Sequence, residues 1–200
     1  MKKIFVNEVG PRDGLQNIDI ILNIDERFQL IQSLERAGIN SLEVGSFVSP
    51  KAVPAMDKTD ALLEKLSTGN SNYSVLIPNT HGYKQAKENK VKEVCLVLCA
   101  TESMNMENIN KNIKDTITEF KEIIKMAKKD QIRTKIYISV AFECPYEGPV
   151  NSQYVYDLTK EFVSYGINEV VIADTIGAGN PNQVQKVFRE LVKDFGSSVF

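Results

Sequence analysis

Arg12 and Asp13 stand side by side in the stretch 7–17, where Gly10, Pro11 and Gly14 favour a turn after an apolar run. A guanidinium is a permanent cation with a rigid fork of donors, which suits a carboxylate, a phosphate or a developing enolate. A carboxylate is a hard ligand for a divalent cation, or a general acid or base. Taken alone, the pair is more simply explained as a surface ion pair in a turn.

Polar residues recur at the ends of further apolar, Val- and Ile-rich runs. These runs are apolar on both faces, as in a parallel sheet that is covered by helices. We predict strands at 4–9, 41–44, 73–77, 93–98, 135–141 and 169–173. The polar residues that follow them include Glu43, Ser46 and Ser49, then Asn79, Thr101, Glu102 and Ser103, then Glu143 and Glu147, and finally Asp174 and Thr175.

Segments with helical periodicity lie between the predicted strands. We expect Asp25 to cap a helix that ends near Ala37-Gly38, and Thr80 to cap a short one. Asn110 or Asn112 is expected to open the longest helix. Further helices are predicted to start near residues 57–59, at residue 152, and after Asn180-Pro181, where proline stands at the first helical position.

This order of about six β–α units indicates an α/β protein, either an open doubly wound sheet or a (β/α)8 TIM barrel. The first turn lacks the G-x-G-x-x-G spacing of a dinucleotide-binding sheet. Polar residues at successive strand ends favour the barrel, although a doubly wound sheet also carries its ligand at that edge. We therefore predict a single catalytic barrel domain over residues 1–200, incomplete at its C-terminus, because such barrels typically need about 250 residues.

Composition excludes several function classes. The net charge of -2 provides no basic field for nucleic acid and no polybasic patch for a membrane. The odd set of cysteines, Cys95, Cys99 and Cys144, is read as reduced thiols, so we expect a cytoplasmic protein. The only histidine, His81, is expected at the surface near a helix start.

Four segments resemble the hydroxymethylglutaryl-CoA lyases, which belong to a family of metal-dependent barrel lyases and condensing enzymes with an Arg-Asp-Gly turn after the first strand. The matching segments are residues 8–17, 43–51, 144–148 and 173–179. The first two are long and specific, and the likeness runs through the whole chain in a consistent order. The resemblance implies cleavage of 3-hydroxy-3-methylglutaryl-CoA to acetyl-CoA and acetoacetate, as in leucine degradation and ketone-body formation, with a bound Mg²⁺ or Mn²⁺. It also implies an acyl-CoA substrate and is compatible with a homodimer for the full-length protein.

The resemblance assigns roles to individual residues. Asp13 matches the metal-binding aspartate and Arg12 the arginine that stabilises the enolate oxygen. Glu43 and Asp174 match acidic residues that line the site, so Arg12, Asp13, Glu43 and Asp174 form the implied catalytic set. Arg12, Gln16 and Asn108, the last in a matching loop, are the implied substrate contacts. For Glu43 and Asp174 the structural alternative is a strand-end carboxylate that caps a neighbouring loop.

The resemblance also implies parts that this chain does not contain. The family continues into a His-x-His metal pair, a glycine-rich cysteine loop and an asparagine metal ligand. We therefore expect the 200-residue chain alone to be inactive. The alternatives to the lyase are a related acyl-CoA lyase or condensing synthase of the same barrel family, and a non-catalytic truncated remnant. Cys144 is expected to shape the rim of the site and not to act as a nucleophile.

Overall fold

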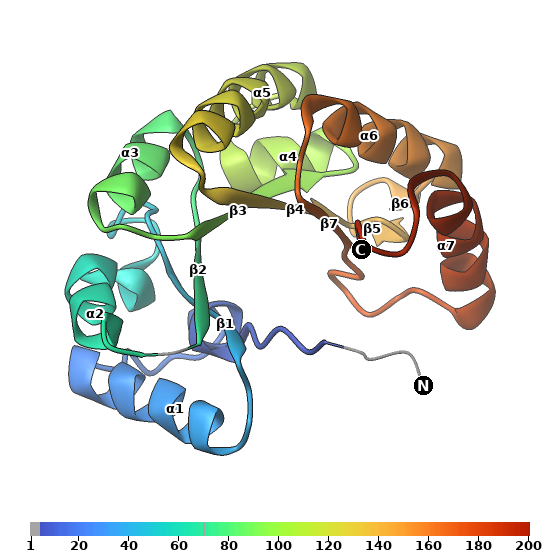
Figure 1. Cartoon of the computed structure of the whole chain (residues 1–200). Coiled ribbons are helices and arrows are strands. Elements are labelled where there is room, and N and C mark those ends of the chain that lie inside the picture. Colours follow the sequence, from blue (N-terminus) through green and yellow to red (C-terminus); the bar gives the residue numbers. More distant parts are fainter. Residues whose placement is uncertain (1–4, 70) are drawn as a thin grey trace. The chain divides into compact units, whose positions relative to one another are not determined.

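The computed structural model describes residues 5–69 and 71–200. Its contacts group the chain into two compact units, Met1–Val94 and Cys95–Phe200, and each is described by itself. Strands and helices alternate along both units (Figure 1). No helix in the described part of the chain is long and apolar enough to cross a bilayer.

The first unit contains two parallel strands with helices packed beside them. Residues 41–46 form β1, which pairs in parallel with β2. In chain order the elements are η1 (Gly10–Gly14), α1 (Ile24–Arg36), β1 (Ser41–Ser46), η2 (Pro54–Met56), α2 (Thr59–Leu66), β2 (Asn72–Leu76) and α3 (Thr80–Glu88).

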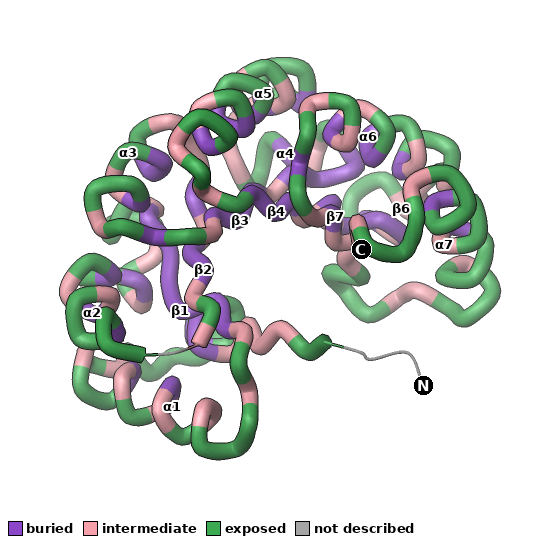
Figure 2. The backbone as a smooth tube through the Cα atoms, in the orientation of Figure 1, coloured by how far each residue is buried: buried purple, intermediate pink, exposed green. Residues whose placement is uncertain are grey.

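The core of the first unit lies between β1 and the helices. Every residue from Leu42 to Ser46 is buried, as is Val75 on the neighbouring strand. Ile31 of α1 and Leu62 of α2 are fully buried as well, and the buried parts of this unit follow the strands in Figure 2. This two-sided burial explains why β1 has no polar–apolar alternation in its sequence.

The strand predicted at 4–9 is wrong for most of its length. Ile4 lies outside the described residues, and the structure records only a single parallel bridge, from Glu8 to Leu42. Phe5 and Val6 are exposed at 80% and 61%. An apolar run becomes a strand only where a neighbouring backbone forms a ladder with it, and in this stretch the structure records the isolated bridge of Glu8 in place of a ladder.

The helices of the first unit begin slightly away from the predicted caps. Asn23, not Asp25, caps α1 and forms a capping box with Glu26. Likewise Asn79, not Thr80, caps α3 by accepting a hydrogen bond from the Gly82 amide at 3.0 Å. Asn and Asp are equally good caps, so the backbone bonds actually formed decide between adjacent candidates. The predicted end of α1 near Ala37 is confirmed.

The second unit repeats the alternation. Its strand order is β3-β4-β7, and β4 and β7 pair in parallel. In chain order the elements are β3 (Glu93–Cys99, which starts at the boundary between the units), α4 (Glu102–Ile109), α5 (Ile113–Asp130), β4 (Arg133–Ser139), β5 (Glu143–Cys144), β6 (Gly148–Pro149), α6 (Ser152–Tyr165), β7 (Glu169–Ile172) and α7 (Pro181–Phe195).

Helices α5 and α6 pack beside β4 and bury an apolar stripe against it (Figure 1). The buried residues of this layer include Phe120, Ile124, Leu158 and Phe162. Gly166 ends α6 in the left-handed conformation at φ 87°, as expected for glycine after a helix. Asn112 is the residue that caps α5, and Asn180 and Pro181 open α7 as predicted.

Two elements of the second unit were not predicted. The helix α4 has polar residues around most of its surface, so it lacks the periodic apolar stripe that identifies a helix in sequence. Asn108 lies within α4 and not in the loop to which the sequence assigned it. The second element is the short antiparallel hairpin β5–β6, which carries Cys144.

Candidate functional site

The turn that carries Arg12 and Asp13 is a π-helical turn, η1, and not an irregular loop. The Val9 carbonyl accepts hydrogen bonds from the amides of Arg12 at 3.0 Å and Asp13 at 2.7 Å. Pro11 stands at the start of the turn, where no amide proton is needed. Single π-helical turns are rare and occur frequently at functional sites, because they aim neighbouring side chains in directions that a regular helix does not reach.

Arg12 is buried at the centre of a cluster of polar side chains. Its Nε donates to Oε1 of Glu43, and its NH1 donates to Oδ1 of Asp13 at 2.8 Å. NH1 also donates to the side-chain oxygen Oε1 of Gln16 at a long 3.4 Å. The side chains of Arg12 and Glu43 are 10% and 0% exposed, whereas that of Asp13 is 55% exposed. The cluster thus holds a buried cation between a buried carboxylate and an accessible one.

Glu43 and Ser46 both belong to β1, next to this cluster. Glu43 acts as the partner of Arg12, which differs from the loop-capping alternative raised by the sequence. Ser46 is 2% exposed, and its hydroxyl has no hydrogen-bond partner among the described residues. Because a buried hydroxyl without a partner is rare in native proteins, Ser46 is a further candidate for contact with a ligand.

Asp174 belongs to the second unit, directly after β7. Its two carboxylate oxygens accept hydrogen bonds from the amides of Ala178 and Gly179, each at 3.0 Å. A Cβ on Gly179 would approach Asp174 Oδ2 to 3.0 Å, so glycine permits this close approach. The loop-capping alternative therefore describes the contacts of Asp174 in this structure, and its place in the catalytic set stays a prediction.

Asn108, the predicted substrate contact of the second unit, is exposed on α4. Its Nδ2 lies 3.8 Å from Cys99 Sγ. The neighbouring Asn105 is fully buried: its side chain accepts from the Cys99 amide at 3.0 Å and donates to the Lys111 carbonyl at 2.8 Å. Asn105 thus fixes α4 on the end of β3.

The cysteines of the second unit differ in their electrostatic surroundings. Burial raises the pKa of the Cys99 thiol to about 11. Burial acts in the same direction on Cys144, but hydrogen bonds from Thr101, from the amides of Tyr146 and Glu147, and from Ser103 outweigh it and lower its pKa. Thr101 Oγ1 lies 3.1 Å from Cys144 Sγ, and Cys144 is only 1% exposed. All cysteines are free and buried, as expected for reduced thiols.

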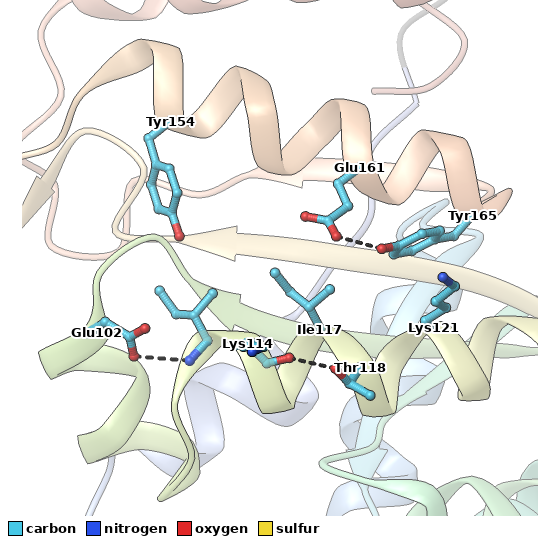
Figure 3. Close-up of a pocket in the computed structure, with 9 residues that line it drawn as sticks. Glu102, Lys114, Ile117, Thr118, Lys121, Tyr154, Glu161 and Tyr165 are labelled. Atoms are coloured by element: carbon cyan, nitrogen blue, oxygen red, sulfur yellow. Dashed lines mark hydrogen bonds between the residues drawn. The ribbon is translucent and has the colours of Figure 1, made fainter.

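A groove of about 450 Å³ lies on the second unit between α5 and α6 (Figure 3). Lys121 from α5 stacks over the Tyr165 ring at 4.7 Å, and the Tyr165 hydroxyl donates to Glu161 at 2.5 Å. These neighbours satisfy one another, and none of the predicted site residues lines the groove. The groove therefore carries no argument about the candidate active site.

The described residues hold no group of three or more His, Cys, Asp or Glu side chains that could bind a metal ion together. Asp13 does offer a hard oxygen donor, because only its Oδ1 is engaged by Arg12 and its side chain is more than half exposed. Mg²⁺ is commonly bound through one or two carboxylates, with waters and substrate oxygens completing its shell. The donor that is present therefore fits one position in the shell of a divalent cation.

Alternating strands and helices, with an ionised cluster where one strand meets a turn, define an α/β protein of the barrel type. In this class the functional side chains lie at the carboxyl ends of the strands.

Comparison with known proteins identifies the family. The chain belongs to the HMGL-like family, whose model matches residues 3–198. It is 36% identical over 195 residues to the hydroxymethylglutaryl-CoA lyase YngG of Bacillus subtilis, which covers 97% of this chain and 65% of that protein. The crystal structure of hydroxymethylglutaryl-CoA lyase from Pseudomonas aeruginosa matches with a TM-score of 0.92 at 35% identity, over 98% of this chain and 65% of that one.

A lyase of the same name from Acinetobacter baumannii, solved in complex with coenzyme A and 3-methylmalate, matches with a TM-score of 0.90 at 31% identity. The match covers 94% of this chain and 62% of the Acinetobacter baumannii protein. These likenesses confirm the predicted barrel class and the predicted family resemblance. The chain spans about two thirds of the length of these relatives, 62% to 65%.

Proposed function

We propose that this chain carries the Arg12-centred part of a hydroxymethylglutaryl-CoA lyase site, in which 3-hydroxy-3-methylglutaryl-CoA is cleaved to acetyl-CoA and acetoacetate. The observation that carries the proposal is the buried Arg12–Glu43 pair, with the accessible Asp13 beside it on a π-helical turn. Membership of the HMGL-like family supports it, as does the likeness to lyases of this name.

The chemistry that Arg12 provides follows from its fixed position. Breaking the carbon–carbon bond leaves an acetyl-CoA enolate whose oxygen becomes negative. A guanidinium already held in place by Glu43 and Asp13 stabilises that charge without reorganising, an effect worth several kcal/mol in comparable sites. Glu43 thus serves to orient Arg12, and Arg12 acts on the developing oxyanion.

Asp13 is proposed to act at the substrate hydroxyl, away from the enolate. The tertiary hydroxyl of the substrate must lose its proton as the bond breaks, and a carboxylate that is 55% exposed is accessible to it. Asp13 is also the residue proposed to hold a divalent cation, Mg²⁺ or Mn²⁺. When bound, such a cation polarises substrate oxygens and favours loss of the hydroxyl proton.

The remaining predicted residues stay part of the proposal. Gln16 contacts Arg12, and Ser46 lies three residues after Glu43 on the same strand. Both provide hydrogen-bonding groups for the acyl part of the substrate. Asp174 and Asn108 are proposed as contributions of the second unit, and Asp174 orders the loop 174–179 through its amide bonds. The coenzyme A seen with the Acinetobacter baumannii relative supports an acyl-CoA substrate.

The physiological setting is proposed from the same chemistry. Acetoacetate and acetyl-CoA are the products expected of the last cleavage in leucine breakdown. Three free, buried thiols are compatible with a reducing cytoplasm, and we propose that compartment for the protein, with a homodimer as its assembly.

The test is a product assay on the protein expressed from its complete gene. After treatment with a chelator, the protein is given 3-hydroxy-3-methylglutaryl-CoA, with and without Mg²⁺ or Mn²⁺, and acetyl-CoA and acetoacetate are measured. We expect both products in equal amounts and only with the added cation. The control substrate is 3-hydroxyglutaryl-CoA, which lacks the methyl group. Turnover of other acyl-CoA esters but not of the methyl compound would assign a related lyase or synthase, and turnover of none would assign a non-catalytic role.

A further inference from the structure

The parallel pairing of β1 with β2 contains a step at the residue that follows Glu43. Glu43 pairs with Ser74, but the next pair joins Gly45 to Val75, so Val44 has no partner in the register. An extra residue of this kind is a β-bulge, which bends the strand and redirects its side chains.

The bulge decides which side chains share a face with Glu43. Paired residues of parallel strands point to the same face, and successive residues of a strand alternate. Glu43 and Ser46 pair with Ser74 and Leu76, which are two residues apart on β2. Glu43 and Ser46 therefore share one face, whereas in a regular strand residues three apart would lie on opposite faces. The bulge brings the partner of Arg12 and the buried hydroxyl without a partner to the same side.

Arg27 of α1 contacts the backbone of this bulge. Its NH2 donates to the carbonyl of Val44, the unpaired residue, at 3.1 Å, and its NH1 donates to the Asp57 carbonyl at 2.9 Å. Arg27 is 2% exposed, and it forms no ion pair among the described residues. Burial lowers the pKa of Arg27, and the charge of Asp57 opposes this effect only in part.

The backbone around the bulge leaves room for this guanidinium. A Cβ on Gly45 would come within 3.0 Å of Arg27 NH2 and within 2.7 Å of Thr59 Oγ1. The distance to Thr59 is shorter than real Cβ contacts, and the guanidinium of Arg27 would also have to give way slightly, so glycine at this position and arginine on α1 fit one another. Burying a cation costs solvation free energy, and here the guanidinium receives two backbone carbonyls in exchange. An apolar side chain could fill the same space without that cost, so space filling alone does not explain an arginine at this position.

We propose that Arg27 is a positioning residue for the candidate active site: by binding the Val44 carbonyl it fixes the bulge in β1 and thereby the placement of Glu43, Ser46 and, through Glu43, Arg12. Arg27 acts through the backbone and touches none of the proposed reacting groups. The kinetic part of this inference rests on the proposed function, whereas its structural part does not.

The experiment compares Arg27→Met and Arg27→Lys with the wild type in the protein expressed from its complete gene. Met preserves most of the side-chain volume but cannot donate, and Lys restores a cation with a single donor group. Arg36→Met is the matched control, because Arg36 is exposed on the same helix and its side chain donates to the nearby Ser33 hydroxyl. For each protein, kcat and KM for 3-hydroxy-3-methylglutaryl-CoA are measured well below its melting temperature, and the crystal structure of Arg27→Met is determined.

We expect Arg27→Met to lower kcat by about 10- to 100-fold with little change in KM, since small displacements of catalytic groups have effects of this size. Arg27→Lys should fall between Met and the wild type, and Arg36→Met should match the wild type. The crystal structure should show the Glu43–Ser74 and Gly45–Val75 register altered, or the Arg12–Glu43 contact broken.

An Arg27→Met protein that is folded, keeps the wild-type kcat and keeps the register would overturn the proposal. If Arg27→Met does not fold, Arg27→Lys decides: a reduced kcat supports the positioning role and an unchanged kcat contradicts it. A wild-type protein without lyase activity would refute the proposed function, and the crystal structure of Arg27→Met would then decide the structural claim alone.

Discussion

The Arg12 guanidinium donates from Nε to the Glu43 carboxylate, although the two residues are 31 positions apart in the chain and both are buried. The contact joins the π-helical turn η1 to β1. The same guanidinium also contacts the accessible Asp13, at 2.8 Å from NH1. One buried cation thus holds a buried carboxylate and an accessible one in a fixed relation.

Removing the charge of Glu43 should destabilise the protein. In Glu43→Gln the amide can still accept from Arg12, but the charge-assisted bond is lost, and such bonds contribute about 1.5–3 kcal/mol. We expect the free energy of unfolding, measured by urea titration, to fall by a similar amount. Glu64→Gln, at an exposed position on α2, should stay within about 0.5 kcal/mol of the wild type. Equal stabilities of both variants would show that the Arg12–Glu43 pair contributes nothing.

Asp13→Asn tests the proposed metal ligand. A neutral amide oxygen holds a divalent cation less well than a carboxylate, so we expect Mn²⁺ affinity to weaken at least about tenfold, or about 1.4 kcal/mol. Calorimetric titration of Mn²⁺ into the protein from its complete gene provides the measurement. Asp19→Asn is the control, because Asp19 is an exposed carboxylate a few residues further along the chain. If Asp13→Asn binds Mn²⁺ as tightly as the wild type, Asp13 is not a ligand.

The raised pKa of Cys99 predicts a pH dependence of stability. The thiol keeps its proton to about pH 11 in the folded state, above its ordinary value of 9.0. The folded chain therefore binds more protons than the unfolded chain between these values, and stability falls as pH rises. The contribution is fully present below pH 9.0 and is lost as pH rises through about 11.

The wild type and Cys99→Ala should be compared by urea unfolding at pH 8 and pH 10. Between these pH values the wild type should lose about 1 kcal/mol more than the variant. Taking the difference between the two proteins removes the contribution of other groups that titrate in alkali. An identical pH dependence in both proteins would contradict the raised pKa.

The capping box of α1 provides a test of the local fold. Asn23→Ala removes the side chain that accepts from the amides of Asp25 and Glu26 and should lower stability by about 1 kcal/mol. Asp25→Ala removes only an exposed ion pair with Lys65, at 2.5 Å, which is worth about 0.5 kcal/mol or less. Thermal melting compares the stabilities of the two variants. A larger loss of stability in Asp25→Ala would support Asp25, the cap predicted from sequence, in place of Asn23.

Much of the fold could be predicted from the sequence because parallel strands are buried on both faces. Continuous Val- and Ile-rich runs identified five strands to within a few residues, and helical periodicity identified α1, α5, α6 and α7. The strand at 4–9 failed because pairing depends on a neighbour and not on the apolar run itself. The helix α4 was missed because its residues carry almost no amphipathic pattern.

The site was predicted only in part. Motif resemblance pointed to Arg12, Asp13 and Glu43, whose roles stay predictions, and the hydrogen bonds that join them depend on tertiary contacts that no local pattern reports. Arg27 was missed for a related reason. An arginine beside the apolar stripe of a helix is usually solvated, but this one is buried and donates to the carbonyl of Val44 at the bulge in β1, a feature of pairing register. Gly45, inside a strand, is the sequence signal that could have pointed to that bulge.

The most direct test of the central claim is the kinetic effect of Arg12→Lys on cleavage of 3-hydroxy-3-methylglutaryl-CoA by the protein expressed from its complete gene. Lysine keeps the positive charge but loses the fork that binds Glu43 and Asp13. That fork is the group proposed to stabilise the enolate oxygen. We predict that kcat falls by at least about 100-fold while KM changes little, the signature of a contact made in the transition state. A variant that retains a kcat close to that of the wild type would contradict the assignment of Arg12 to the reaction.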